Sequence, residues 1–169
     1  MAWQLTDSLE EFERAAGEHL RADPVRQTVP LTVLASLRHN GAAAFGANPP
    51  VFGWHEQRRG TVDGAILQTP PFPLLVASLP AGSARALLDV LAADRGLPAV
   101  VSVAGADEPG VLAAWAATTG GTGAARMRSR LYLLGQLTQP DPAPPGAARI
   151  AADSDRDLLI DWHEAFRLK

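Results

Sequence analysis

The sequence predicts an α/β fold built on a mixed β-sheet, and three observations lead to this expectation. After Pro50, two runs with extended patterns, 51–55 and 62–68, are separated by the polar residues 56–60, which is typical of an antiparallel hairpin. Residues 74–79 are uninterruptedly apolar, as in a strand covered on both faces. A glycine turn, a helical pattern and a second apolar run at 98–103 follow, which predicts a right-handed parallel βαβ unit.

The residues before the hairpin predict one strand and two helices. Residues 3–6 form the expected strand, and Thr6 or Asp7 is expected to cap the helix that follows. Its apolar face consists of Leu9, Phe12, Ala16 and Leu20. Asp23 and Pro24 predict the start of a second helix, with an apolar stripe at Val33, Leu34 and Leu37. Pro30 is expected to kink or split that helix, because proline lacks the backbone donor.

After the hairpin, prolines at 70, 71 and 73 interrupt the ladder before the central strand. Gly82 and Ser83 are expected to open a helix whose inward face is Ala84, Leu87, Leu88, Leu91 and Ala92. Asp107 and Pro109 predict another helix, with Val111, Leu112 and Trp115 inward, which ends at Gly120–Gly123.

Residues 125–134 are predicted to return as a strand. Arg126, Arg128 and Arg130 would then share one face of the sheet, because side chains alternate along a strand. Such a row grips a phosphate or carboxylate, or forms a solvated face that discourages unwanted edge pairing; the second interpretation is favoured.

Composition excludes several classes of function. The chain has 169 residues, a net charge of −3 and no cysteine, and Lys169 is its only lysine. The charge argues against a nucleic-acid partner, which needs a dense basic face. The absence of cysteine excludes disulfide scaffolds, thiolate metal sites and cysteine nucleophiles. No apolar run approaches the roughly 20 residues of a membrane helix, and the first residues do not resemble a signal peptide, so no membrane association and a cytoplasmic location are expected.

The domain organisation is predicted from the proline distribution. Residues 139–146 hold four of the 14 prolines and are interpreted as a linker. Residues 1–138 are then one domain, and 147–169, with a helix start at Asp153, are interpreted as the truncated beginning of a second domain. The amphipathic helix there carries Leu158, Leu159, Trp162 and Phe166 on one stripe and needs a surface to cover it.

The arrangement resembles the acetyl-CoA-dependent N-acetyltransferases of the GNAT superfamily, in particular the degenerate amino-terminal half of two-domain bacterial members. The similar stretches are 23–29 (DPVRQTV), 67–75 (LQTPPFPLL), 130–135 (RLYLLG) and 155–159 (DRDLL). The resemblance implies acetyl-CoA as cofactor, a small-molecule or protein amine as acceptor, and a carboxyl-terminal GNAT domain as partner. Asp7-Ser8 and Asp153-Ser154 are offset by 153 − 7 = 146 residues, about one such domain.

The family's cofactor signature, Gln/Arg-x-x-Gly-x-Gly/Ala, corresponds to residues 79–84. The resemblance therefore implies that Gly82, Ser83 and Ala84 are the cofactor-binding residues. Leu79 stands where the family has Gln or Arg, and Pro80 has no N–H to offer a diphosphate. These departures predict a half that serves as a scaffold and as one wall of the substrate cleft, while a second domain performs acyl transfer.

Catalytic residues are not identifiable from the sequence. His19, His39, His55 and His163 lack the short helical spacing of metal ligands, so no metal site is predicted. His55 is the one histidine considered as an acid or base. Two alternatives remain open: a non-enzymatic binding or dimerisation module that uses the carboxyl-terminal helix, with a homodimer as one outcome, and an intact small acetyltransferase that uses residues 82–84.

Overall fold

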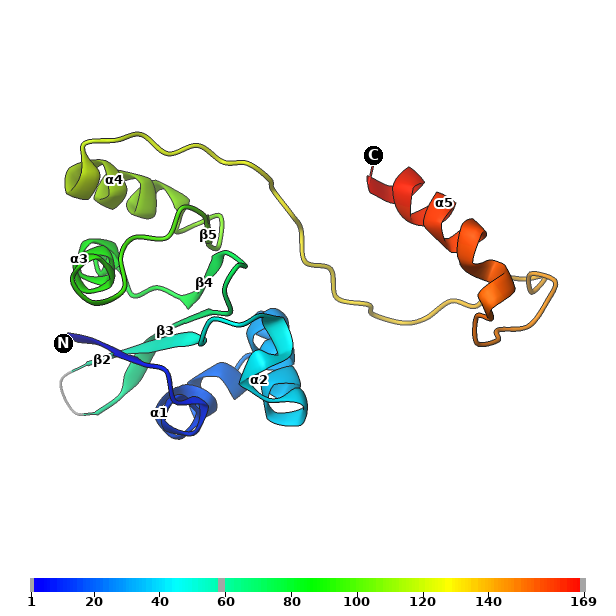
Figure 1. Ribbon diagram of the computed structural model, residues 1–169, viewed down its shortest axis with the longest axis horizontal. Coiled ribbons are helices and arrows are strands. Elements are labelled where there is room, and N and C mark those ends of the chain that lie inside the picture. Colours follow the sequence, from blue (N-terminus) through cyan, green and yellow to red (C-terminus); the bar gives the residue numbers. More distant parts are fainter. Residues whose placement is uncertain (1, 58–59, 168–169) are drawn as a thin grey trace. The chain divides into compact units, whose positions relative to one another are not determined.

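The computed structural model describes residues 2–57 and 60–167, and the chain divides into two compact units, Met1–Tyr132 and Leu133–Lys169. The first unit contains a five-stranded sheet with helices on both faces (Figure 1). Its elements are β1 (Ala2–Thr6), α1 (Leu9–Arg21), α2 (Thr28–Asn40), η1 (Ala42–Phe45), β2 (Val51–Glu56), β3 (Val62–Gln68), β4 (Leu74–Ser78), α3 (Ala84–Asp94), β5 (Val101–Ser102) and α4 (Glu108–Thr119).

The strands lie in the order β1-β2-β3-β4-β5. Neighbours from β1 to β4 pair antiparallel, whereas β4 and β5 pair in parallel through Leu74↔Val101 and Leu75↔Ser102. The predicted mixed α/β sheet, the hairpin and the βαβ unit are therefore confirmed. The second strand of that unit is shorter than the predicted 98–103, since Pro98 has no N–H for the ladder and pairing with β4 covers only two residues.

Helix α1 is capped by Ser8 instead of the predicted Thr6 or Asp7. The Ser8 hydroxyl accepts a hydrogen bond from the Glu11 amide at 3.2 Å. The Thr6 hydroxyl is already engaged, because it donates to the Glu11 carboxylate at 2.5 Å and accepts from the Ser8 amide at 3.1 Å. The predicted inward face is confirmed for Phe12, Ala16 and Leu20, each of which is fully buried.

Helix α2 starts later than predicted and is not split by Pro30. Asp23 and Pro24 form a turn before the helix, in which the Asp23 carboxylate accepts from the Arg26 amide at 3.1 Å. Because α2 begins at Thr28, Pro30 falls in the first turn, where the backbone amides have no partner within the helix and a missing donor costs nothing. The predicted kink is therefore wrong.

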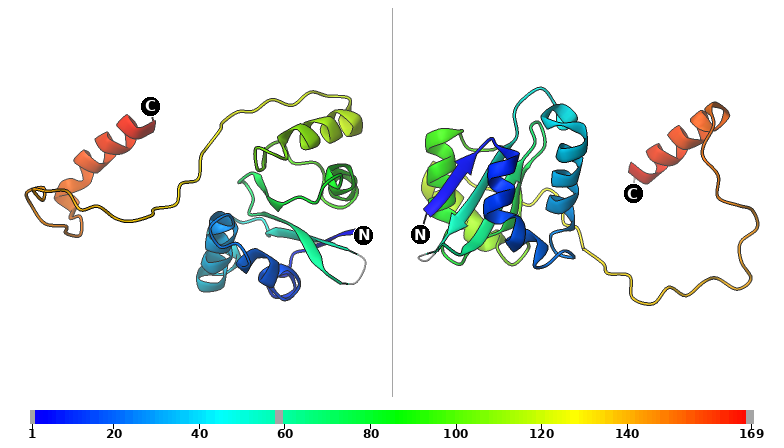
Figure 2. Two further views of the ribbon diagram at one scale, coloured as in Figure 1. Left: turned by 180° about the vertical axis from the view of Figure 1, so that it is seen from behind. Right: turned by 90° about the horizontal axis from the view of Figure 1, so that it is seen from below.

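The core consists of one apolar layer on each face of the sheet (Figure 2). Helices α1 and α2 cover one face, where Phe12 stacks on Phe52 with ring centroids 5.0 Å apart. Helices α3 and α4 lie on the other face, where Leu87 and Leu91 pack with Trp3 of β1. Two details of the predicted helix faces differ. Ala92 is exposed, and the inward side chains of α4 are only partly buried because α4 packs mainly on α3.

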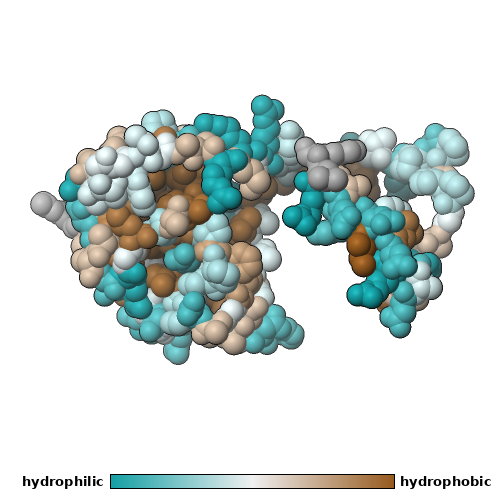
Figure 3. Space-filling model, turned by 45° about the horizontal axis from the view of Figure 1, so that its top comes forward, coloured by the Kyte–Doolittle hydropathy of each residue, from teal (hydrophilic) through white to brown (hydrophobic). Residues whose placement is uncertain are grey.

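The second unit contains η2 (Asp153–Asp155) and α5 (Arg156–Arg167). Arg149 forms a two-pronged ion pair with Asp155 at 2.6 and 2.7 Å, and the Asp155 carboxylate also accepts from the Ala152 amide at 2.8 Å, which fixes the start of this helical segment. Within the unit the apolar stripe of α5 is exposed, including Trp162 at 64% and Phe166 at 82%. Figure 3 shows brown apolar residues beside teal hydrophilic ones on the surface of this unit.

None of the helices in the described parts of the chain combines the length and the apolar character that crossing a bilayer demands.

Candidate functional site

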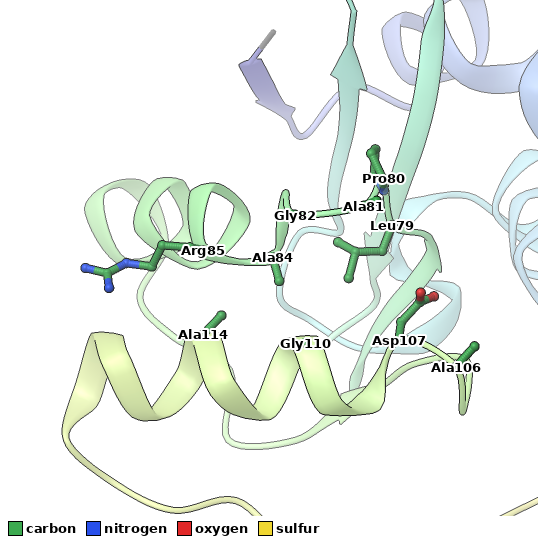
Figure 4. Close-up of a pocket in the computed structure, with 10 residues that line it drawn as sticks. All are labelled: Leu79, Pro80, Ala81, Gly82, Ala84, Arg85, Ala106, Asp107, Gly110 and Ala114. Carbon is green, nitrogen blue, oxygen red and sulfur yellow. The ribbon is translucent and has the colours of Figure 1, made fainter.

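A pocket of about 430 Å³ lies where β4 ends and α3 begins (Figure 4). One wall is the loop Leu79–Gly82 together with Ala84 and Arg85 at the start of α3. The other wall is the start of α4, with Asp107, Gly110 and Ala114. The pocket therefore sits at the carboxyl end of a strand of the parallel pair, where open α/β sheets usually bind ligands.

The loop after β4 turns sharply at Gly82, whose φ of +75° is in the left-handed region. An added Cβ on Gly82 would meet no atom within 4 Å, so the backbone conformation and not crowding favours glycine here. The Ser83 amide donates to the Pro80 carbonyl at 3.0 Å, and the Ser83 hydroxyl donates to the same oxygen at 2.8 Å. Both donors of Ser83 are thus engaged within the loop.

Of the three residues that the resemblance assigns to cofactor binding, only two line the pocket. Gly82 and Ala84 line the pocket, whereas Ser83 is buried and its polar atoms turn toward Pro80. The Ser83 hydroxyl makes no capping bond to α3, so the first amides of that helix are left to the solvent or a ligand. Pro80 has no amide hydrogen. Pro80 and Ser83 therefore offer no free donor to a diphosphate, and the first amides of α3 are the ones that remain.

The charges around the pocket do not favour an anion. The amino ends of α3 and α4 both lie at the pocket and carry partial positive charge. Arg85, however, points away along α3 and pairs with Asp89 at 2.8 Å. Asp107 directs its carboxylate toward Leu79 (Figure 4). A diphosphate placed in this pocket would meet this carboxylate and an engaged Ser83.

Sequence reasoning missed the contribution of α4. Gly110 and Asp107 reach the pocket only because α4 packs against α3, which is a tertiary contact. The available signal was the position of the Asp107–Pro109 helix start directly after β5, since βα loops of parallel strands gather at one edge of a sheet.

His55 of β2 is buried and does not line the pocket. Its ring is tilted over Trp3 with centroids 5.3 Å apart, and its Nδ1 lies 2.6 Å from Oδ1 of Asp63. A register shift between β2 and β3 next to His55 lets Asp63, the extra residue, reach it. An added Cβ on Gly64 would lie 2.9 Å from the His55 Cβ and 2.8 Å from the Pro80 ring. Gly64 thus lies closely packed between His55 and the Pro80 ring.

The Asp63 carboxylate is the titratable group that the hairpin perturbs. Burial raises the pKa of Asp63, but hydrogen bonds from His55 and from Gln57 lower it more, so the net pKa is below its ordinary value. Gln57 Nε2 lies 2.5 Å from Oδ2, and His55 holds Oδ1. Both oxygens of the carboxylate are therefore engaged as acceptors, which favours a structural role.

The other histidines also lie outside the pocket. His19 Nε2 lies 2.7 Å from the Ser78 hydroxyl, which connects the end of α1 to β4, and His39 and His163 are exposed. In residues 2–57 and 60–167, no group of three or more His, Cys, Asp or Glu side chains is arranged to hold a metal ion.

The predicted strand at 125–134 is wrong. These residues have no regular structure and are exposed, so Arg126, Arg128 and Arg130 do not share a strand face. The guanidinium of Arg128 instead pairs with both oxygens of Glu108, at 2.6 and 2.9 Å. This contact holds Arg128 beside the first turn of α4.

Comparisons of the chain with models of known families, with curated proteins and with solved structures gave no match.

Proposed function

We propose that the first unit is a degenerate GNAT-like domain that serves as a scaffold and as one wall of the substrate cleft in an acetyl-CoA-dependent N-acetyltransferase. One observation carries the proposal: a strand, two helices and three antiparallel strands lead into a parallel βαβ unit, with a pocket at the carboxyl end of β4. This is the arrangement on which the resemblance to the superfamily rests.

The scaffold role is supported by the chemistry of the loop. Leu79 replaces the polar residue of the signature, and Pro80 lacks an amide hydrogen. The amide and the hydroxyl of Ser83 both donate to the Pro80 carbonyl. Asp107 adds a negative charge to the pocket. Because these features work against a diphosphate, we place cofactor binding and acyl transfer to the amine acceptor in a carboxyl-terminal GNAT domain. The proposed setting is the cytoplasm, which a cysteine-free chain suits.

Calorimetric titration of the full chain with acetyl-CoA tests the proposal. The unmodified protein is expected to show no saturable binding. The double variant Leu79→Arg, Pro80→Ala restores the first position of the signature and adds the amide that Pro80 lacks, and it is expected to gain binding because an amide and a cationic side chain are then available to the phosphates. Pro80→Ala alone is the matched control and is expected to gain less. Circular dichroism checks that each variant is folded.

Two results would contradict this function. Saturable binding by the unmodified chain would favour an intact small acetyltransferase that uses Gly82 to Ala84. A correctly folded double variant that gains no affinity would remove the support for a GNAT-like cofactor loop at this position.

The second candidate is a non-enzymatic binding or dimerisation module. The observation in its favour is the exposed apolar stripe of α5, with Leu158, Trp162 and Phe166. Light scattering on the chain with and without residues 153–169 tests it, and association that disappears with the deletion would support this candidate.

A further inference from the structure

The end of β4 carries a register shift that turns Ser78 toward α1. Ile66 pairs with Val76 and Ala65 pairs with Ser78, so Ala77 is an extra residue in β4. Ile66 and Val76 belong to the apolar layer under α3, and regular alternation would send Ser78 to the same side. The extra residue instead places Ser78 opposite Ala65, on the face that α1 and α2 cover. Bulges often re-aim a side chain in this way next to an active site.

On that face the Ser78 hydroxyl meets the imidazole of His19. His19 lies in the last turn of α1, and its Nε2 is 2.7 Å from Oγ of Ser78. Both residues are half-buried, so both retain contact with solvent. In the tautomer that carries its proton on Nδ1, the ring accepts the hydroxyl proton at Nε2. A serine hydroxyl bonded to a histidine ring is the arrangement that activates serine as a nucleophile. The two residues are 59 positions apart, so spacing in the sequence does not reveal the pair.

A buried side chain with an unused acceptor lies next to this pair. Gln27 is 5% exposed and, instead of capping α2, donates from Nε2 to the Ala77 carbonyl at 3.1 Å. This bond places its amide beside the peptide group that joins Ala77 to Ser78. Among the described residues, Oε1 of Gln27 has no hydrogen-bond partner. Leaving a buried acceptor unpaired costs about 1–3 kcal/mol, so this oxygen favours a water or ligand that donates to it.

We propose that Ser78, His19 and Gln27 form a second site, on the α1 face of the sheet, that hydrolyses small activated carboxylic esters through an acyl-serine intermediate. Leu79, the next residue, lines the pocket on the α3 side, whereas none of the three proposed residues does. The inference is therefore independent of the proposed acetyltransferase role.

The reaction has two halves. In the first, His19 Nε2 takes the hydroxyl proton while the Ser78 oxygen bonds to the carbonyl carbon of the ester. The bond from that carbon to the leaving oxygen breaks, and His19 returns the proton to the leaving group. In the second, Oε1 of Gln27 accepts a hydrogen bond from a water molecule and His19 takes a proton from it. The water oxygen bonds to the acyl carbon, the acyl–serine bond breaks, and the proton returns to Ser78 as the carboxylic acid leaves.

The full chain treated with p-nitrophenyl acetate gives the first test. Mass spectrometry after acid quenching is expected to find an acetyl group on the peptide that contains Ser78, and absorbance should show continued release of p-nitrophenolate. Lys169 is the only lysine, which keeps other acetylation low. Ser78→Ala is expected to lose both signals. Ser102→Ala, which removes an exposed hydroxyl from the neighbouring strand β5, is the matched control and should keep both. A parent without acetyl on Ser78, or a Ser78→Ala variant with the turnover of the parent, would overturn the proposal.

The second test separates the two partner roles from a structural one. His19→Gln is expected to slow acetylation of Ser78 by about 100-fold, the lower end of a general-base contribution. His39→Gln, on the exposed side of α2, is the matched control and should keep the rate of the parent. Gln27→Met keeps the side-chain length and is expected to accumulate acetyl-Ser78, because only hydrolysis uses Oε1. Circular dichroism checks that each variant is folded. Parental acetylation in folded His19→Gln, or parental hydrolysis in folded Gln27→Met, would refute the assignment.

Discussion

The contact between Gly64 of β3 and Pro80, in the loop after β4, can be tested by replacing Gly64 with alanine. A Cβ at Gly64 would lie 2.8 Å from the Pro80 ring, 2.8 Å from the Trp3 indole and 2.9 Å from the His55 Cβ. None of these atoms is the end of a flexible side chain, so none can move away without shifting its strand or loop. The backbone at Gly64 needs no positive φ, so any loss of stability comes from crowding.

Overpacking of this kind costs typically about 1–3 kcal/mol, and three rigid contacts place Gly64→Ala toward the upper end. Urea denaturation should show this loss as a lower midpoint with an unchanged slope. In a unit of this size the melting temperature should fall by about 3–5 °C for each kcal/mol.

Gly110→Ala is the matched control, because it makes the same chemical change in α4 where an added Cβ meets no atom within 4 Å. It should leave stability unchanged or raise it by up to about 1 kcal/mol, since alanine favours a helix over glycine. Equal effects of the two substitutions would refute the reasoning, because the crowding of Gly64 by Pro80 would then contribute nothing.

Three further outcomes are expected. Asp63→Asn should lower the free energy of unfolding at pH 7, and this loss should shrink as the pH falls below 3.8, the ordinary pKa of an aspartate. The reason is that a carboxylate with a lowered pKa stabilises the fold only while it is ionised. A loss that urea titrations find constant from pH 7 to pH 3 would contradict this. Phe12→Ala removes a fully buried ring stacked on Phe52 and should cost about 3–5 kcal/mol in the same assay. Ser83→Ala removes the 2.8 Å bond to the Pro80 carbonyl and should cost about 0.5–1.5 kcal/mol, and a melting temperature equal to that of the parent would argue against that bond.

The sequence predicts those parts of the fold that depend on local periodicity. The hairpin, the central strand and the helix after Gly82 were found because apolar spacing and glycine turns signal them directly. The short length of β5 and the irregular conformation of residues 125–134 were not predicted, because a strand forms only where a neighbouring strand pairs with it. The predicted kink at Pro30 was wrong for a related reason. The effect of this proline depends on where α2 starts, and Gln27, the residue before the helix, makes no side-chain capping bond that would mark the start.

The candidate site was predicted in part. Gly82 and Ala84 line the pocket, whereas Ser83 does not, because the direction of its hydroxyl is set by the turn and not by its place in the motif. The pair of His55 and Asp63 depends on a register shift in the hairpin, which a regular alternation could not reveal.

Opposing contributions of similar size decide whether a phosphate binds at the loop after β4. The amino end of each helix favours an anion by about 0.3–1 kcal/mol. To use the Ser83 amide, the anion must break a 3.0 Å bond to the Pro80 carbonyl, a loss of about 0.5–1.5 kcal/mol, and it must also tolerate the Asp107 carboxylate. The two helix ends together favour the anion by about 0.6–2 kcal/mol, so they roughly offset the lost bond and leave the Asp107 carboxylate to oppose binding. Because Pro80→Ala adds one amide but leaves Ser83 engaged, only a variant that also supplies a cation at position 79 changes the balance decisively.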